Sequence, residues 1–263
     1  MQWFIDIIYG LCKNYIDAYL ATHPSLGFFV DRGDPLAWDF TVGDFTDDNA
    51  WHDLDLSSIV PAGANSVLLK INLETLEIEK KFELRKKDNT DIYNTLAIWT
   101  QFSNVRIGGV FLVPCNANRV IQYLANPATW SVMNVQVNGW FLDSEKTIGF
   151  INRGDAGSPD FEAPDLTHDG AWHTLDLTAI IPAATSAIAI HAGIRSADIS
   201  AGMLFRTLGN TGIYNLSICR THSAGIGFDY DIVVPTNSLQ SIEYWSSLLT
   251  SPTVQLTVKG WWF

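Results

Sequence analysis

Hydrophobic and polar residues alternate along most of the chain with a period of two rather than 3.6. Turns rich in Asn, Gly, Asp and Pro separate the alternating runs. Such a pattern is typical of strands with one buried face, and the short regular spacing favours an antiparallel sandwich. In the first half of the chain we predict strands at 37–45, 50–56, 66–77, 80–86, 93–102, 106–114, 119–124 and 131–141.

The whole pattern occurs twice, at a constant offset of 121 residues. FVDRGD at 29–34 returns as FINRGD at 150–155. The same offset pairs AWHDLDLSSIVPA (50–62) with AWHTLDLTAIIPA (171–183), RKKDNTDIYN (85–94) with RTLGNTGIYN (206–215), and VNGWF (137–141) with VKGWW (258–262), without a gap. A long gap-free repeat predicts two copies of one fold.

These observations predict an all-β protein of two tandem eight-stranded antiparallel β-sandwiches, jelly-roll-like and related by internal duplication, with an added N-terminal amphipathic helix. The absence of a Cys…Trp…Cys spacing disfavours an immunoglobulin sandwich. The predicted organisation is an N-terminal helix and connector (1–28), module one (29–141), a linker (142–149) and module two (150–263).

The N-terminal segment has helical rather than strand periodicity. Apolar residues at i, i+3, i+4 and i+7 spacing predict a helix over about residues 3–21, ending before Pro24. Module two has no such helix, so neither sandwich should need one to fold. We therefore expect the N-terminal helix to mediate assembly. The predicted assembly interface is Trp3, Phe4, Ile7, Ile8, Leu11 and Tyr15.

Charge narrows the possible partners. Lys plus Arg number 16 and Asp plus Glu number 28, a net charge of −12 that disfavours nucleic acid. The N-terminal segment has no secretory-signal pattern, and Asp6, Lys13 and Asp17 interrupt its only apolar stretch. Membrane contact through the helix is therefore a lesser alternative.

The cysteines and acidic turns indicate no cofactor. Cys12, Cys115 and Cys219 match no metal motif, and no disulfide is expected, since Cys115 aligns with Thr236. Calcium is an alternative that the sequence leaves open, although no EF-hand pattern occurs. The acidic stretches concerned are Asp44, Asp47 and Asp48 in module one, and Asp165, His168 and Asp169 in module two.

No motif predicts an enzyme. The repeated Trp51-His52 with Asp55 and Trp172-His173 with Asp176 lack a nucleophile at a fixed place in both copies, so structural packing is the simpler interpretation. The two Arg-Gly-Asp tripeptides are interpreted as tight turns in which Arg and Asp pair locally, with cell adhesion as the alternative. We predict no catalytic residues and no metal site.

Basic residues in module one have few counterparts in module two. Lys80, Lys81, Arg85, Lys86 and Lys87 alternate with Glu79 and Glu83, and only Arg206 matches them. A solvated strand face explains this run most simply. The alternative is a subunit contact that only module one makes, with its basic patch meeting an acidic patch on a neighbouring subunit.

The repeated AWHDLDLSSIVPA, FELRK, NTDIYN, VPCN, RVIQY and VNGWF resemble a small β-sandwich module of phage and environmental viral structural proteins, such as tail fibres and other virion surface proteins. Two such modules behind a helix are also similar to small double jelly-roll capsid proteins. The resemblance implies a scaffold and no catalytic residues.

We therefore predict a non-enzymatic structural protein of a virus-like particle, a capsid or virion surface component, that self-assembles as a homo-oligomer. The expected oligomer is a trimer, and other virion proteins are further expected partners. The expected location is the virion, assembled in host cytoplasm, or an extracellular assembly. One alternative is a filament or tube subunit. The other is a receptor- or carbohydrate-binding module with an exposed aromatic platform drawn from Trp38, Trp99, Trp130, Trp245 and Trp262.

Overall fold

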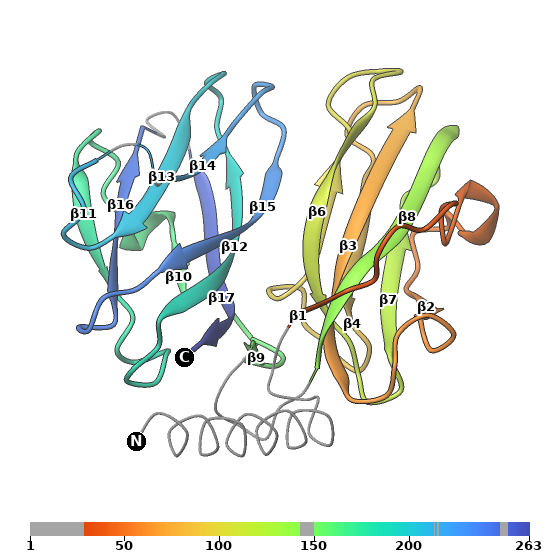
Figure 1. Ribbon diagram of the computed structural model, residues 1–263. Coiled ribbons are helices and arrows are strands. Elements are labelled where there is room, and N and C mark those ends of the chain that lie inside the picture. The colour runs from red at the N-terminus through yellow and green to blue at the C-terminus, as the bar shows by residue number, and fades with distance from the viewer. Residues whose placement is uncertain (1–28, 143–149, 213, 215, 248–251) are drawn as a thin grey trace, which may run out of the picture.

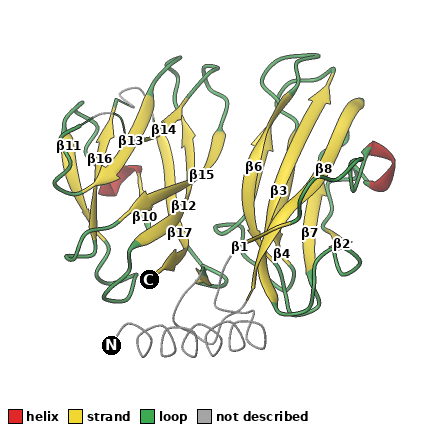
Figure 2. Cartoon of the chain, in the orientation of Figure 1, coloured by secondary structure: helices red, strands yellow, loops and turns green. Residues whose placement is uncertain are grey.

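The computed structural model describes residues 29–142, 150–212, 214, 216–247 and 252–263. Within these ranges the chain forms four antiparallel sheets, which make two β-sandwiches side by side (Figure 1). Strands dominate, and the helical segments described are single short turns (Figure 2). The predicted all-β chain of tandem sandwiches is confirmed. The predicted N-terminal helix lies outside the described residues, with its six interface residues.

Module one contributes eight strands. Their bounds are β1 (Phe29–Asp31), β2 (His52–Asp55), β3 (Ala64–Thr75), β4 (Lys81–Lys86), β5 (Leu96–Trp99), β6 (Ile107–Pro114), β7 (Val120–Ala125) and β8 (Trp130–Leu142), with the 3-10 turn η1 (Val42–Asp44) between β1 and β2. The last strand extends one residue into the predicted linker.

Module two repeats this series, with one additional two-residue strand. Its elements are β9 (Ile151–Asn152), β10 (Phe161–Glu162), η2 (Ala163–Asp165), β11 (Trp172–Asp176), β12 (Ala187–Arg195), β13 (Gly202–Thr207), β14 (Ser217–Arg220), β15 (Phe228–Pro235), β16 (Ser241–Ser246) and β17 (Thr253–Trp262).

Strand order is the same in both modules. In module one the sheets read β1-β8-β3-β6 and β2-β7-β4-β5. In module two they read β10-β17-β12-β15, with β9 also on β17, and β11-β16-β13-β14. Successive strands exchange between two facing sheets in the order of an eight-stranded jelly roll.

Each module has its own hydrophobic core. One cluster of buried residues runs from Leu54 to Val137 and the other from Leu166 to Val258, each drawing on both sheets of its module. Leu54 and Leu56 point inward while Trp51 stacks outside, as the alternation predicts. Each sandwich therefore has a complete core of its own.

Repeated glycines mark a close approach of two strands. A Cβ on Gly139 would lie 2.4 Å from the Val30 carbonyl oxygen, and one on Gly260 would lie 2.2 Å from that of Ile151. Only glycine lets these backbones pair, which explains the NGW and KGW of the repeat. Next to each glycine the last strand forms a β-bulge.

The predicted strand at 37–45 is wrong. Phe40 makes only an isolated bridge to Val135, and residues 42–44 form η1. The reason is local side-chain bonding: the amide of Thr41 donates to Asp44 at 2.7 Å, and Asp39 accepts from the amide of Val137 at 2.7 Å. Those bonds favour a turn over a ladder. The true first strand is the short β1.

Candidate binding site between the modules

The site is built on the β-bulge of β17. Lys259 is the residue left unpaired there, opposite the step from 189 to 190 in β12. A bulge redirects the side chain of its extra residue. Lys259 is almost fully buried, and its Nζ donates to Asp231 at 2.6 Å and to the Leu112 carbonyl of module one at 3.1 Å. The bulge thus aims a cation at the other module.

A buried charge cluster surrounds Lys259. His191 of β12 lies between two carboxylates of β15, with Nε2 3.3 Å from Asp229 and Nδ1 3.4 Å from Asp231. His191, Asp231 and Lys259 each expose less than a tenth of their side chains. Buried charges are stable only when paired and hydrogen-bonded, as these are.

The pKa shifts follow from this pairing. Burial alone lowers the pKa of His191, but hydrogen bonds to Asp229 and Asp231 outweigh it and raise the pKa to about 9. Burial tends to raise the pKa of Asp231, whereas Lys259 and His191 together bring it below the ordinary value. His191 is therefore an imidazolium at neutral pH, between Asp229 and Asp231.

Hydrogen bonds join this cluster to module one. The Trp99 indole of β5 donates from Nε1 to Asp229 at 2.9 Å. Asn65 donates from Nδ2 to the Phe150 carbonyl at 3.0 Å. Figure 1 shows β6 of module one and β15 of module two on the sides of the modules that face one another.

The second Arg-Gly-Asp turn is part of the same contact. Asp155 accepts from the amide of Thr90 at 2.6 Å, and Asn94 donates from Nδ2 to the Gly154 carbonyl at 2.7 Å. Among the described residues, the first turn forms no corresponding bond to the other module, and Asp34 is exposed.

The two arginines of these tripeptides do not pair with their own aspartates. Arg32 bonds to Asp39 and Arg153 to Asp160, and these aspartates also accept from the amides of Val137 and Val258 at the bulges. The predicted local pairing within the tripeptide is therefore wrong. The arginines support the bulge.

Two clefts flank the line of contact. The first has a volume of about 410 Å³ and the second about 460 Å³. Trp99 and Asp229 line both clefts and separate them. Volumes of this size fall in the range of small-molecule sites.

The first cleft combines an aromatic ring with hydrogen-bonding groups of both kinds. Module one contributes Trp99 and Glu83, while module two contributes Gln255 and the exposed Arg195. Lys81 lies 5.6 Å from the centre of the Trp99 ring and 2.9 Å from Glu83. Carboxylates accept, the guanidinium donates, and the amide does both, so the cleft can bind a polyhydroxylated molecule.

Part of the basic run of module one belongs to this cleft. Lys81 and Glu83 line it, so they meet module two rather than only solvent. Arg85 instead stacks on Trp51, 4.0 Å from the ring centre, and Lys87 pairs with Asp53. Lys81 and Glu83 thus belong to a cleft between the two modules of one chain, and the predicted contact with a neighbouring subunit stays a prediction.

The repeated Trp-His pairs form packing units. Arg206 lies 3.8 Å from the ring centre of Trp172, as Arg85 does over Trp51. His52 and His173 each bond to the aspartate four residues earlier at 2.8 Å, Asp48 and Asp169 respectively. Asp55 and Asp176 instead accept from the backbone amides of Ser57 and Thr178. The structure gives these residues packing and turn-forming partners.

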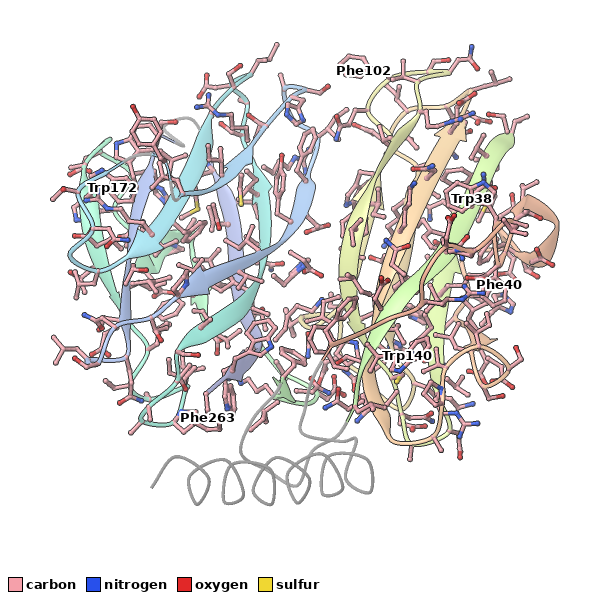
Figure 3. All side chains as sticks on the ribbon, viewed as in Figure 1. Trp38, Phe40, Phe102, Trp140, Trp172 and Phe263 are labelled. Carbon is pink, nitrogen blue, oxygen red and sulfur yellow. The ribbon has the colours of Figure 1, made fainter. Side chains whose placement is uncertain are left out.

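The five tryptophans considered as an aromatic platform do not come together. Trp99 lies in the clefts. Trp245 pairs in register with Trp172 on the neighbouring strand β11, on the outer side of module two (Figure 3). The other three have local partners: Trp38 lies below Lys70, Trp130 donates to the Asn126 carbonyl, and Trp262 packs on Phe150.

The acidic turns are occupied by local bonds. Asp44 accepts from Thr41, Asp165 from the Glu162 amide, and His168 bonds to Ser246. Asp47 accepts from the amide of Ala128 at 3.2 Å. Among the residues that the structure describes, no group of three or more His, Cys, Asp or Glu side chains is placed to hold a metal ion.

The described cysteines are buried free thiols. Burial raises the pKa of Cys115 to about 11 and also raises that of Cys219. Cys12 lies outside the described residues. Over the described ranges, no helix has the length and hydropathy to span a bilayer.

Comparison with known proteins adds two distant structures. No family model matches the sequence, and the search of curated proteins finds no match. Among solved structures, the N-terminal CBM22-1-CBM22-2 tandem domain of Paenibacillus barcinonensis Xyn10C is 14% identical, with 78% of this chain and 82% of that chain covered and a TM-score of 0.23. The PBSX exported protein XepA is 13% identical, with 80% and 81% covered and a TM-score of 0.22. At these TM-scores neither structure carries an argument about this chain.

Proposed function

We propose that this chain is a non-enzymatic carbohydrate-binding protein and that its first cleft holds a short neutral glycan. The observation that carries the proposal is the cleft itself, where Trp99 of one module meets Gln255 and Arg195 of the other in a volume of about 410 Å³. Sugar rings pack their C–H faces on aromatic rings, and their hydroxyls bond to carboxylates, amides and guanidinium groups.

Charge favours a neutral glycan over an acidic one. The chain has a net charge of −12, and Glu79, Glu83 and Asp229 line the first cleft alongside Lys81 and Arg195. The net negative charge of the chain would repel a polyanion. The hydroxyl groups of a neutral sugar can instead bond to the donors and acceptors that line the first cleft.

Binding is tested by calorimetry and affinity electrophoresis with a panel of neutral oligosaccharides and polysaccharides. We expect Trp99→Ala and Gln255→Ala to weaken binding about tenfold or more, which is 1.4 kcal/mol or more. Gln255→Ala should leave the melting temperature unchanged, because the side-chain amide of Gln255 forms no hydrogen bond with another residue that the structure describes.

The matched control is Trp172→Ala, on the outer side of module two, which should leave binding unchanged. Loss of binding in this control, with Trp99→Ala unaffected, would move the site to the Trp172 and Trp245 surface. Failure of every glycan to bind the wild-type chain would overturn the proposal.

A self-assembling structural subunit of a virus-like particle is the second candidate function. Apolar residues fully open to solvent support it: Leu36 is 100% exposed and Tyr214 is 98% exposed. Exposed apolar side chains of this kind are common at association surfaces. A trimer, contact with other virion proteins, and a location in the virion or an extracellular assembly belong to this proposal.

The test of the second candidate is negative-stain microscopy and light scattering of the full chain and of a chain lacking residues 1–24. Shells, fibres or trimers of the full chain would support self-assembly, and their loss on deletion would assign the contact to Trp3, Phe4, Ile7 and their neighbours. A monomeric wild-type chain would contradict it.

A further inference from the structure

The contact between the modules uses a different surface of each. Module one contributes what we call the edge surface, Thr90, Asn94, Ala97 and Trp99 on β5 and the loop before it. Module two contributes what we call the turn surface, Gly154, Asp155, Gly157 and Asp229. These surfaces are joined by the bonds of Thr90 and Asn94 to the Gly154-Asp155 turn and of Trp99 to Asp229.

The duplication gives each module both surfaces. Module two therefore has its own edge surface, with Thr211, Ile218 and Arg220 at the positions of Thr90, Ala97 and Trp99. Module one has its own turn surface, with Gly33, Asp34 and Leu36 at the positions of Gly154, Asp155 and Gly157. Among the described residues, the hydrogen bonds between the edge surface and the turn surface use only the edge surface of module one and the turn surface of module two.

The carboxylate-to-amide part of the contact is kept in the second copies, whereas Trp99 and Asp229 are replaced there by Arg220 and Gly108. Asp34 supplies the same carboxylate as Asp155, and the backbone amides of Thr211 and Gly212 correspond to those that Asp155 binds at Thr90 and Asp91. Asp34, Thr211 and Gly212 are all exposed.

Exposed apolar side chains lie close in sequence to these polar groups in the second copies. Ala97 is 4% exposed in the intrachain contact, and its counterpart Ile218 is 49% exposed. Tyr93 is half-buried, whereas its counterpart Tyr214 is 98% exposed. A Cβ on Gly157 would lie 3.7 Å from Asp91 across the contact, and its counterpart Leu36 is fully exposed. Ala97 is buried and Tyr93 is half-buried, whereas their counterparts Ile218 and Tyr214 are exposed, and Leu36 adds an exposed apolar side chain where Gly157 has none.

We propose that copies of this chain associate head to tail, with the edge surface of module two on the turn surface of module one in the next copy. The contact repeats between chains the carboxylate-to-amide bonds found within one chain, and it buries Ile218, Tyr214 and Leu36. Because the two surfaces differ, the association is heterologous, and each chain has two neighbours. This assembly mode rests on the second proposed function, the self-assembling subunit, and is independent of glycan binding.

The test uses the full chain and light scattering over a wide range of concentration. The wild-type mass should rise with concentration beyond that of a dimer. Ile218→Asp blocks the edge surface and Leu36→Asp blocks the turn surface, and each should stop this growth. Leu239→Asp is the matched control, because Leu239 is 65% exposed and its counterpart Asn118 lines neither surface. It should behave as the wild type.

Mixing the two blocked variants gives the decisive measurement. Ile218→Asp retains an intact turn surface and Leu36→Asp an intact edge surface, so an equimolar mixture should form a one-to-one dimer and nothing larger. Unchanged melting temperatures of both variants would show that each still folds.

Two results overturn the inference in distinguishable ways. If the wild type stays monomeric at every concentration, both the self-assembling function and this mode of assembly fail. If the wild type associates but the blocked variants associate equally well, or their mixture forms no dimer, only the head-to-tail mode fails.

Discussion

The two modules have the same strand order but different chemistry on the same outer surface. Both keep the glycine beside the bulge and the arginine that braces it, Arg32 or Arg153. In module one the bulge residue is Asn138, and Lys70 and Val110 are exposed nearby. In module two the matching residues are Lys259, His191 and Asp231, all buried against module one.

This difference teaches which residues define the fold and which define its contacts. Residues that hold backbone to backbone are the same in both copies, since either sandwich needs them. Outward residues differ, because those of module two form a buried charge cluster that bonds to Leu112 and Trp99 of module one, whereas Lys70 and Val110 are exposed. The buried charges are therefore a property of the contact between modules rather than of the sandwich.

The largest difference between the modules should come from the charge cluster. Asp231→Ala removes the carboxylate that pairs with both Lys259 and His191. Removing one partner of a buried ion pair lowers the free energy of unfolding by about 3–5 kcal/mol. Val110→Ala, the matched change in module one, should cost under about 1 kcal/mol, because Val110 is 51% exposed. Urea denaturation measures both. Equal losses would show that the cluster adds nothing specific to module two.

A substitution at the bulge glycine should affect both modules alike. Gly139→Ala and Gly260→Ala place a Cβ 2.4 Å and 2.2 Å from a backbone oxygen. We expect each to lower the free energy of unfolding by about 1–3 kcal/mol, as overpacking does. The urea midpoints of the two variants can be compared directly. A large loss in one variant alone would mean that the two bulges are not equivalent.

Raising the pH should weaken the fold through module two. The folded-state pKa of His191 is raised from 6.5 to about 9. Its stabilising contribution is therefore full below pH 6.5, declines above it, and is lost as the pH passes about 9. The urea midpoint of the wild type should fall over this range more than that of His191→Gln. Parallel pH profiles would exclude His191 as the source.

Much of the architecture followed from the sequence. Period-two alternation located seven of the eight predicted strands of module one, and the constant offset implied a second copy with the same strand order. Alternation works for these strands because one face packs on a core, as for Leu54 and Leu56 beside the outward Trp51. It failed at 37–45, where the side chains of Asp39 and Asp44 take the backbone amides that a ladder would use.

The candidate site was largely invisible in the sequence. Trp99 was singled out as one of five tryptophans. Lys81 and Glu83 belonged to a run interpreted as a solvated strand face, with a subunit contact as the alternative. His191, Asp229, Asp231 and Lys259 gave no signal, since they lie on three different strands and match no motif. An unequal repeat was the only available hint, because each differs from its module-one counterpart.

By itself the sequence determined two copies of an all-β module, since alternation and a gap-free repeat depend only on neighbours along the chain. Only the tertiary structure decided which outward surface of each copy became buried. That choice depends on how the two sandwiches meet. Lys259 would be interpreted as a surface lysine from the sequence alone. In the structure it lies at a bulge, buried, and its Nζ donates to Asp231 and to the Leu112 carbonyl of the other module.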